Sequence, residues 1–179
     1  MAGSINCWSP GPAEISSHFA IRHRVFVDEQ GVMVLTDIDP LDHYPSTIHV
    51  LAARGEAIAG TVRLYPVGNE GRWKGDRLAV LPAHRASLVG VKLVRYAVSR
   101  AAASGGVEME ASVQTANTSF FEHLGWRRNG PIRPYFGLPH QPMIIDLADV
   151  PAVNEARPLN ASLSPLADLS EQSPLLVAS

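Results

Sequence analysis

The stretch from Leu81 to Leu93, LPAHRASLVGVKL, has the residue types of a turn that binds phosphate groups. An apolar segment leads into it, Arg85 supplies a positive charge, and Gly90 stands where a helix is expected to begin. The N–H groups of a helix N-terminus attract anions, and glycines let the backbone approach them closely. Leu88 occupies one of the positions where glycine is expected, so an ordinary strand-to-helix turn fits the stretch equally well. Both interpretations stay open on these residues alone.

Side chains that can transfer protons occur along the whole chain. Glu108 and Glu110 fall on one face of an expected strand, with Met109 on the other face. For each single carboxylate, an exposed structural role is the alternative. His140 equally fits a structural hydrogen-bonding role, and Tyr135 fits a position in the core or at its rim.

No metal site is expected. His18 and His23 are five residues apart, so they do not share a helical face. The acidic loop with Asp37, Asp39 and Asp42 lacks the glycine-centred frame of a calcium loop. We expect this loop to be solvated, and an acidic rim that attracts a cationic ligand is the functional alternative.

The composition restricts the classes of protein. The 179 residues fit one domain plus a tail, and 46% apolar residues indicate a globular chain. A formal net charge of −2 argues against nucleic-acid binding, which needs a basic face. Cys7 is the only cysteine, so no intrachain disulfide is expected. No stretch approaches the roughly 18 apolar residues of a membrane span, and no secretory signal is visible. We therefore expect a cytoplasmic protein with no membrane or nucleic-acid partner.

Hydrophobic periodicity predicts an α/β fold, a mixed central sheet flanked by helices. Helices are expected at 12–29, 88–104 and 117–125, and strands at 5–8, 47–53, 57–67, 76–82, 107–113, 126–130 and 141–147. Loops are expected at 31–46, 68–75 and 131–140. The glycine motifs of dinucleotide-binding and P-loop folds are both absent.

The composition changes at Ala148, after which prolines interrupt a Ser/Ala/Leu-rich stretch. We expect a domain over residues 1–147 and a tail over 148–179, with one short helix near 166–171.

The order of the landmarks resembles the GNAT acetyltransferases. That family's pyrophosphate turn, Q/R-x-x-G-x-G/A, matches Arg85 to Gly90, and a long helix follows it. A second landmark, an Asn before an aromatic pair and L-G-[FWY], matches Asn117, Phe120, Phe121 and the Leu-Gly-Trp at 124–126. The stretches IRHRVFVDEQGV and YFGLPHQPM narrow the resemblance to the ElaA-like group, and GNATs found beside bacterial nitrilase genes are similar too. The resemblance covers about residues 6–147.

This resemblance implies a mixed sheet, acetyl-CoA as co-substrate and a small amine as acceptor. The backbone of 78–80 would pair with the pantetheine arm, and an N–H there could polarise the thioester carbonyl. The cofactor-binding residues would be Leu78, Ala79, Val80, Arg85, Ala86, Ser87, Leu88, Val89, Gly90, Val91, Asn117 and Phe120. The candidates for the catalytic base and acid are Glu29, Glu110, Tyr135 and His140. In the family, a tyrosine at the position of Phe121 often protonates the departing CoA thiolate, and phenylalanine cannot do so. Tyr96 is a further residue that could take this role, beside Tyr135 and His140.

Two other functions stay open. Arg22, Phe26, Glu29, Asp42 and Arg63 also resemble the acyl-homoserine-lactone synthases, which share the fold, whereas FFEHLGW argues for an ordinary GNAT. Alternatively, Leu88 and Phe121 would mark a CoA-binding module with weak or no catalysis. A homodimer is an open alternative to a monomer.

Overall fold

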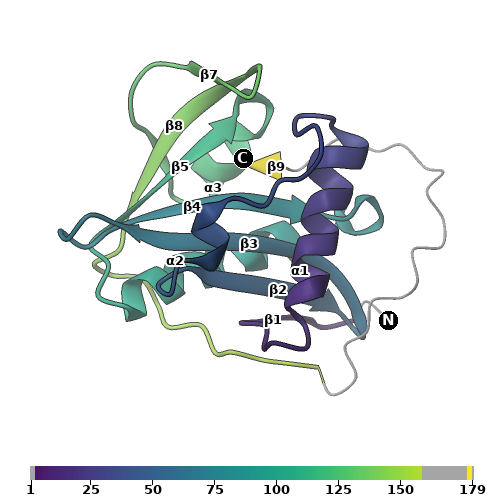
Figure 1. Cartoon of the computed structure of the whole chain (residues 1–179). Helices are drawn as coiled ribbons and strands as arrows, with labels where there is room; N and C mark the ends of the chain where they lie inside the picture. Colours follow the sequence, from purple (N-terminus) through teal and green to yellow (C-terminus); the bar gives the residue numbers. More distant parts are fainter. Residues whose placement is uncertain (1–2, 159–176, 179) are drawn as a thin grey trace.

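The computed structural model describes residues 3–158 and 177–178, and it confirms the expected mixed sheet with helices on both faces (Figure 1). The strands are β1 Ile5–Trp8, β2 Ile48–Arg54, β3 Ala57–Val67, β4 Arg72–Val80, β5 Glu108–Gln114, β6 Arg127–Arg128, β7 Arg133–Tyr135, β8 Leu138–Asp146 and β9 Val177–Ala178. The α-helices are α1 Ile15–Arg22, α2 Val89–Ala103 and α3 Thr118–His123. The π-helix η1 is His23–Glu29, and the 3-10 segments are η2 Pro40–His43, η3 Pro82–His84 and η4 Thr115–Asn117.

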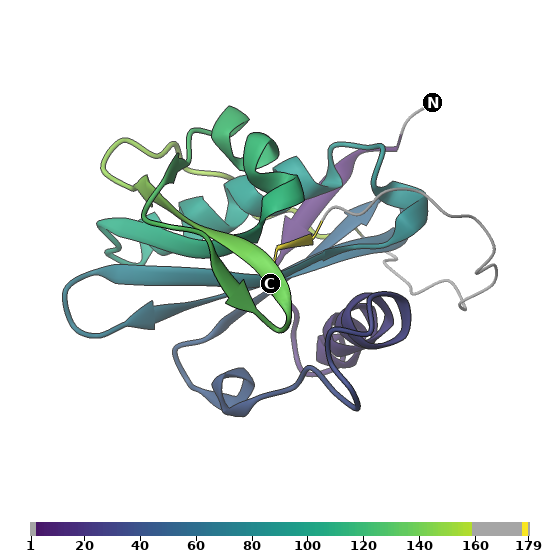
Figure 2. The ribbon, with the colours of Figure 1, turned by 90° about the horizontal axis from the view of Figure 1, so that it is seen from above.

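The sheet has the strand order β1-β2-β3-β4-β9-β5-β8-β6, and β7 pairs with β8. Among the described strands, only β4 and β5 pair in parallel, and α2 provides the crossover between them. Figure 2 shows α1 and η1 on one side of this sheet and α2 and α3 on the other.

Successive residues of each strand face opposite sides of the sheet, which gives the protein two hydrophobic cores. On β2, Leu51 and Ala53 pack under the first helix, whereas Val50 and Ala52 face α2. The helical segment α1–η1 contributes Ile21, Val25 and Phe26 to its core. The core beneath α2 contains its buried residues Val89, Leu93, Val94, Tyr96, Ala97, Val98 and Ala101.

The first helix changes its hydrogen-bonding pattern after Arg22. The expected helix over 12–29 is α-helical only to Arg22 and π-helical from His23 to Glu29. Such stretches are rare and often occur at functional sites.

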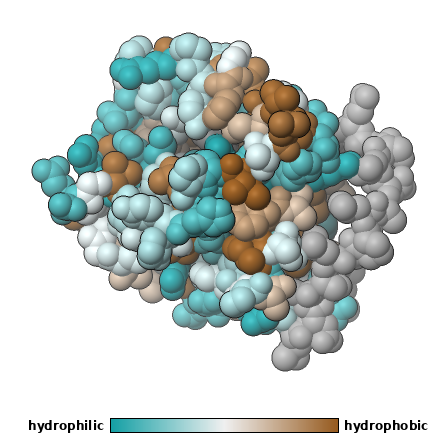
Figure 3. Space-filling model, in the orientation of Figure 1, coloured by the Kyte–Doolittle hydropathy of each residue, from teal (hydrophilic) through white to brown (hydrophobic). Residues whose placement is uncertain are grey.

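The loop after η1 exposes Val34 (88%) and Leu35 (82%), and Figure 3 shows hydrophobic side chains on this face of the molecule. Dimerisation stays a prediction.

β4 begins at Arg72, earlier in the sequence than expected, and it pairs with β5 only over its first three residues. The expected loop 68–75 ends at Gly71, because Trp73 is buried and Gly75 leaves room for Met109, whose Cε would lie 2.6 Å from a Cβ there. The parallel pairing ends at Lys74 and Glu110.

Beyond that pair, β4 has an extra residue relative to β3, and Arg77 in this bulge has a φ of 51°. Non-glycine residues seldom adopt such a backbone conformation. The two strands β4 and β5 diverge here, and β9 lies between them.

The prediction of a loop over residues 131–140 is wrong, because this range contains the turn and the paired residues of the β7–β8 hairpin. Tyr135 pairs with Leu138, so the turn consists of Phe136 and Gly137, with φ values of 46° and 74°. Positive φ at both central residues is typical of a type I′ hairpin turn. The hairpin brings Tyr135 back beside His140, with ring centroids 5.3 Å apart.

The segment after the last long strand lies against the domain as far as it is described. The N–H of Ala156 donates to the carbonyl of Cys7, and the N–H of Val153 donates to Ser99 Oγ. Figure 1 shows this segment passing beside β1. The expected helix near 166–171 lies outside the described residues. In the described part of the chain, no helix is both long and apolar enough to cross a membrane.

Candidate active site

The diverging part of β4 forms one wall of the site. Leu78, Ala79 and Val80 are buried, and their side chains belong to the two cores. They therefore offer a ligand their backbone edge rather than their side chains. Leu78 and Ala79 already pair with β9 along this edge. The edge can thus bind an extended chain that carries amide groups.

The turn after β4 reaches α2 without strain. Leu88, the N-cap of α2, has a φ of −81° and a side chain that is 61% exposed. The position therefore does not require glycine, and the side chain does not fill the turn. Leu88 gives no side-chain cap, so first-turn N–H groups of α2 are available to an anion. The other turn residues expected at the cofactor are exposed Ala86, half-buried Ser87 and Val91, and buried Val89 and Gly90.

The helix α3 lies beside this turn. A Cβ built on Gly90 would lie 3.5 Å from Phe120 Cζ, which is an ordinary contact. Asn117, the last residue of η4, is buried. The two landmarks quoted from the sequence are therefore adjacent in space at the first turn of α2.

Arg85 lies differently from its expected position at a pyrophosphate. Its Nη1 and Nη2 donate to the two carboxylate oxygens of Glu29, both at 2.6 Å, and its Nε donates to the carbonyl of Val80 at 2.9 Å. The residue is 5% exposed. This geometry favours a role in which Arg85 and Glu29 hold the end of η1 against the turn. The ion pair with Arg85 also gives Glu29 a structural role that the other catalytic candidates do not share.

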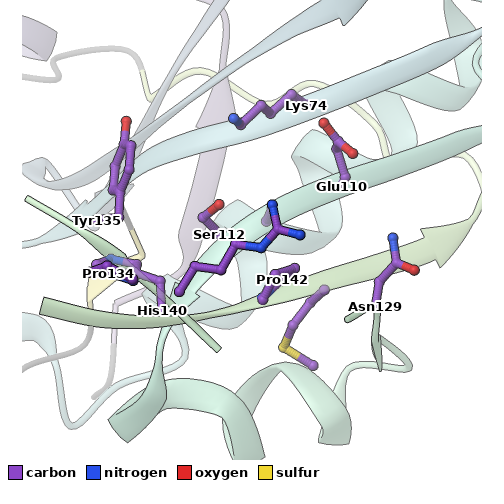
Figure 4. Close-up of a pocket in the computed structure, with 11 residues that line it drawn as sticks. Lys74, Glu110, Ser112, Asn129, Pro134, Tyr135, His140 and Pro142 are labelled. Carbon is purple, nitrogen blue, oxygen red and sulfur yellow. The ribbon is translucent and has the colours of Figure 1, made fainter. Parts of the chain in front are cut away.

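Three of the four catalytic candidates lie together at a cavity of about 260 Å³ (Figure 4). Glu110 reaches it from β5, Tyr135 from β7 and His140 from β8. Its lining is Lys74, Glu110, Ala111, Ser112, Asn129, Arg133, Pro134, Tyr135, His140, Pro142 and Met143. Lys74 and Glu110 are the last β4–β5 pair, so the cavity adjoins the point where the strands diverge.

His140 is held as a neutral base in the wall of this cavity. Its Nδ1 lies 2.9 Å from the carbonyl oxygen of Leu138. A carbonyl only accepts, so Nδ1 carries the proton and donates, and Nε2 keeps its lone pair. Nε2 has no hydrogen-bond partner among the described residues, and the residue is 2% exposed. Burial lowers the pKa of His140 below its usual value, which favours the neutral imidazole.

Two carboxylates of the acidic loop are buried rather than solvated, so the expectation of a solvated acidic loop is wrong for them. Asp37 and Asp42 are buried and pair with the guanidinium of Arg22. The Nη1 of Arg63 lies 2.7 Å from Asp39, and its Nη2 lies 2.7 Å from Asp76.

Arg77, in the β4 bulge, joins the same network. Its guanidinium carbon lies about 6 Å from the ring centroids of Phe26 and Phe136. The network fixes the first helix and its loop to the sheet, with the carboxylates already neutralised.

Phe121 lies in the core beneath α2, 3% exposed, with its ring centroid 5.4 Å from that of Trp126. Both rings line a small apolar cavity of about 20 Å³ that also reaches Ala111. Tyr96 is completely buried and does not line the larger cavity. Of the three substitutes named for the family's tyrosine, Tyr135 and His140 line the larger cavity and Tyr96 does not.

Comparisons with known proteins agree with this architecture. The model of the acetyltransferase (GNAT) domain matches residues 45–128. A Bacillus subtilis (strain 168) protein, provisionally named an acetyltransferase, is 30% identical over 129 residues, which are 71% of this chain and 86% of that protein. The chain belongs to the GNAT acetyltransferase family. The expected family is thus confirmed.

Solved structures with less than 25% sequence identity show the same fold as this GNAT protein. Escherichia coli ElaA has a TM-score of 0.69 and 19% identity, with 80% of this chain and 99% of ElaA covered. The CoA-dependent acyl-homoserine lactone synthase BjaI has a TM-score of 0.65 and 18% identity, with 83% of this chain and 85% of BjaI covered. The ElaA-like proteins and the acyl-homoserine-lactone synthases named in the sequence analysis are therefore both represented among solved structures with this fold.

The sequence analysis missed two cations of this GNAT site, Lys74 and Arg133. Both lie in segments that were expected to be loops. The signal for Lys74 was present, because Trp73 and Lys74 continue the apolar–polar alternation that typifies a strand.

Proposed function

We propose that this protein transfers the acetyl group of acetyl-CoA to the nitrogen of a small amine held in the 260 Å³ cavity. One observation carries the proposal: His140 lines the cavity, and its buried Nε2 has no hydrogen-bond partner among the described residues. Acyl transfer to an amine needs a group that accepts a proton, and this is the group best prepared for it.

The residues along β4 and α2 fit the cofactor. The backbone edge of Leu78 and Ala79 already pairs with an extended chain, and the pantetheine arm is also extended and carries amides. Leu88 gives α2 no side-chain cap and Ser87 Oγ accepts only from the N–H of Val89, at 3.4 Å, so N–H groups at Gly90 and Val91 would bind the pyrophosphate. When bound, acetyl-CoA supplies a thioester whose carbonyl carbon accepts the amine. N–H groups of β4 would hold the carbonyl oxygen as its charge develops.

The proton then has a defined path. An aliphatic amine arrives mostly protonated, with a pKa near that of lysine, about 10.4. His140 Nε2 removes the proton directly or through one water, and the freed nitrogen attacks the thioester. The C–N bond forms, the nitrogen gives its second proton to solvent or to the departing sulfur, and the C–S bond breaks to release CoA. A thiol of pKa about 8.5 leaves without a dedicated acid, so Phe121 is compatible with turnover.

The other candidates take supporting roles. Glu110 offers the incoming ammonium a negative charge at the end of the β4–β5 pairing. Tyr135 packs edge-on against His140 and restricts its ring. Glu29 acts through Arg85 on the pyrophosphate turn rather than on the amine.

The test is CoA release from acetyl-CoA against a panel of small amines, with acetylated product detected by mass spectrometry. A thiol reagent suits it, because Cys7 is buried and burial raises the pKa of its thiol to about 12. We expect release that depends on the amine. Measured CoA binding without release across the panel would favour the inactive binding module instead.

Release with an acyl-carrier protein and S-adenosylmethionine, but with no amine, would favour the synthase. Three of the side chains that resemble those of the synthases are not accessible to a substrate in this structure. Arg22, Asp42 and Arg63 pair with one another, and their side chains are inaccessible to solvent.

A further inference from the structure

The cavity presents charges of both signs that no ion pair of residues 3–158 neutralises. Lys74, Glu110 and Arg133 line it, and within the described residues no ion pair involves any of them. The arginines and aspartates of the neighbouring buried network, by contrast, are paired. Figure 4 shows Lys74 and Glu110 side by side on adjacent strands above Ser112. Within the part of the chain that the structure describes, the arrangement leaves two cations and one anion for a ligand.

A simple amine does not fit this charge pattern. Its ammonium would be attracted by Glu110 but repelled by Lys74 and Arg133, and His140 is neutral because burial lowers its pKa. An acceptor with an acidic group as well as an amine would match all three charges. Arg133 can bind a carboxylate through two parallel N–H groups, and Lys74 can bind it as a point charge.

We propose that the acceptor is a zwitterionic amine of amino-acid type, whose carboxylate binds Lys74 and Arg133 while its amine lies between Glu110 and His140. This inference rests on the proposed function. It adds a specificity that the family resemblance does not provide. The volume of about 260 Å³ is at the small end for ligand sites, which suits a free amino acid.

The experiment compares amines that differ only in the carboxylate, leucine and 3-methylbutylamine, by the kcat/KM of CoA release. We expect leucine to be favoured by at least about tenfold, the effect of one charge-assisted contact of about 1.4 kcal/mol. Lys74→Met and Arg133→Met should each remove most of that preference: kcat/KM for leucine should fall, and that for 3-methylbutylamine should rise, because a cation that repels its ammonium is gone. Arg127→Met, at an exposed arginine on β6 outside the cavity, is the matched control and should keep the preference.

The possible outcomes separate this inference from the proposed function. Equal or faster turnover of 3-methylbutylamine, with no effect of either cation variant, would overturn the zwitterionic acceptor and leave amine acetylation intact. Preference for phosphoethanolamine over every amino acid tested would overturn the carboxylate assignment. No turnover of any amine would reject the proposed function itself.

A second inference comes from β9, which lies on the edge proposed for the pantetheine arm. Val177 pairs with Ala79, and Ala178 pairs with both Leu78 and Val113. The C-terminal segment thereby bridges the two diverging strands (Figure 1). One backbone edge cannot pair with two chains at once. We infer that the C-terminal strand and CoA compete for the gap between β4 and β5.

Isothermal titration of CoA tests this competition. Deletion of residues 177–179 should lower the Kd for CoA several-fold, and Ala178→Pro should do so too because proline disfavours strand pairing. A synthetic peptide of the last residues should raise the Kd of the truncated protein again. An unchanged or higher Kd after the deletion would overturn the competition, whereas a full chain and a truncated chain that both fail to bind CoA would contradict the proposed function.

Discussion

The carboxylate of Glu29 receives both terminal nitrogens of Arg85 at 2.6 Å, which connects the end of the π-helix η1 to the turn before α2. The pair joins residues 56 positions apart, and both belong to motifs that resemble the family. It places the end of the first helix in direct contact with the turn proposed for the pyrophosphate.

Glu29→Gln tests this coupling. The variant removes the carboxylate charge of Glu29 from the nearly buried guanidinium of Arg85, so we expect a loss of roughly 1–3 kcal/mol in the free energy of unfolding. The Kd for CoA should change by less than about threefold, because neither side chain is the proposed phosphate ligand. Urea denaturation and CoA titration measure the two effects. Unchanged stability with lost CoA affinity would instead place Arg85 on the phosphate.

Two substitutions of Gly90 distinguish the effect of added bulk at the turn from the effect of added negative charge. A Cβ there meets only ordinary contacts, so Gly90→Ala should fold and bind CoA almost as the wild type does. Gly90→Asp adds a carboxylate among the N–H groups that would hold the pyrophosphate, and it should abolish CoA binding. Titration of both variants with CoA is the measurement. If Gly90→Asp folds and keeps its affinity, the pyrophosphate binds elsewhere.

The buried ion network should dominate the response of stability to single substitutions. Arg63→Met leaves Asp39 and Asp76 without their shared cation, so we expect a loss of about 3–5 kcal/mol. Arg72→Met is the control, because Arg72 and its partner Glu70 are exposed, and it should change stability by less than about 0.5 kcal/mol. Urea denaturation of the two variants compares them directly. Equal effects would contradict the role of the network.

Stability should also fall on mild acidification. Burial, and then the positive charge of Arg22, hold the pKa of His18 well below its usual value. Below a pH of about 6.5 the unfolded chain therefore binds protons that the folded chain excludes, so the free energy of unfolding decreases as pH falls. Denaturation at pH of about 7.5 and about 5.5, on either side of that value, measures the change, and His18→Gln should reduce it. A wild type that is equally stable at both values would contradict the buried neutral histidine.

The sequence predicted the elements whose side chains alternate or repeat clearly, and it missed those fixed by distant contacts. The helix before Ser104 and the strand at 57–67 follow from apolar periodicity. The acidic loop could not be predicted as buried, because its partners Arg22 and Arg63 lie on other elements.

The candidate site was predicted only in part for the same reason. His140 and Glu110 were named from their types and motifs, but the hairpin that encloses the cavity depends on a two-residue turn at Phe136. The tautomer of His140 depends on the carbonyl of Leu138, and no sequence pattern reveals that contact.

The proposed chemistry depends above all on His140 as the base for acetylation of an amine in the cavity. The most direct test compares the initial rates of amine-dependent CoA release by the wild type and by His140→Asn, at saturating acetyl-CoA. We expect a wild-type rate that depends on the amine and a loss of about 10²–10⁴-fold in the variant, the range for a missing general base. A variant that folds, binds CoA and releases it as fast as the wild type would contradict the role of His140.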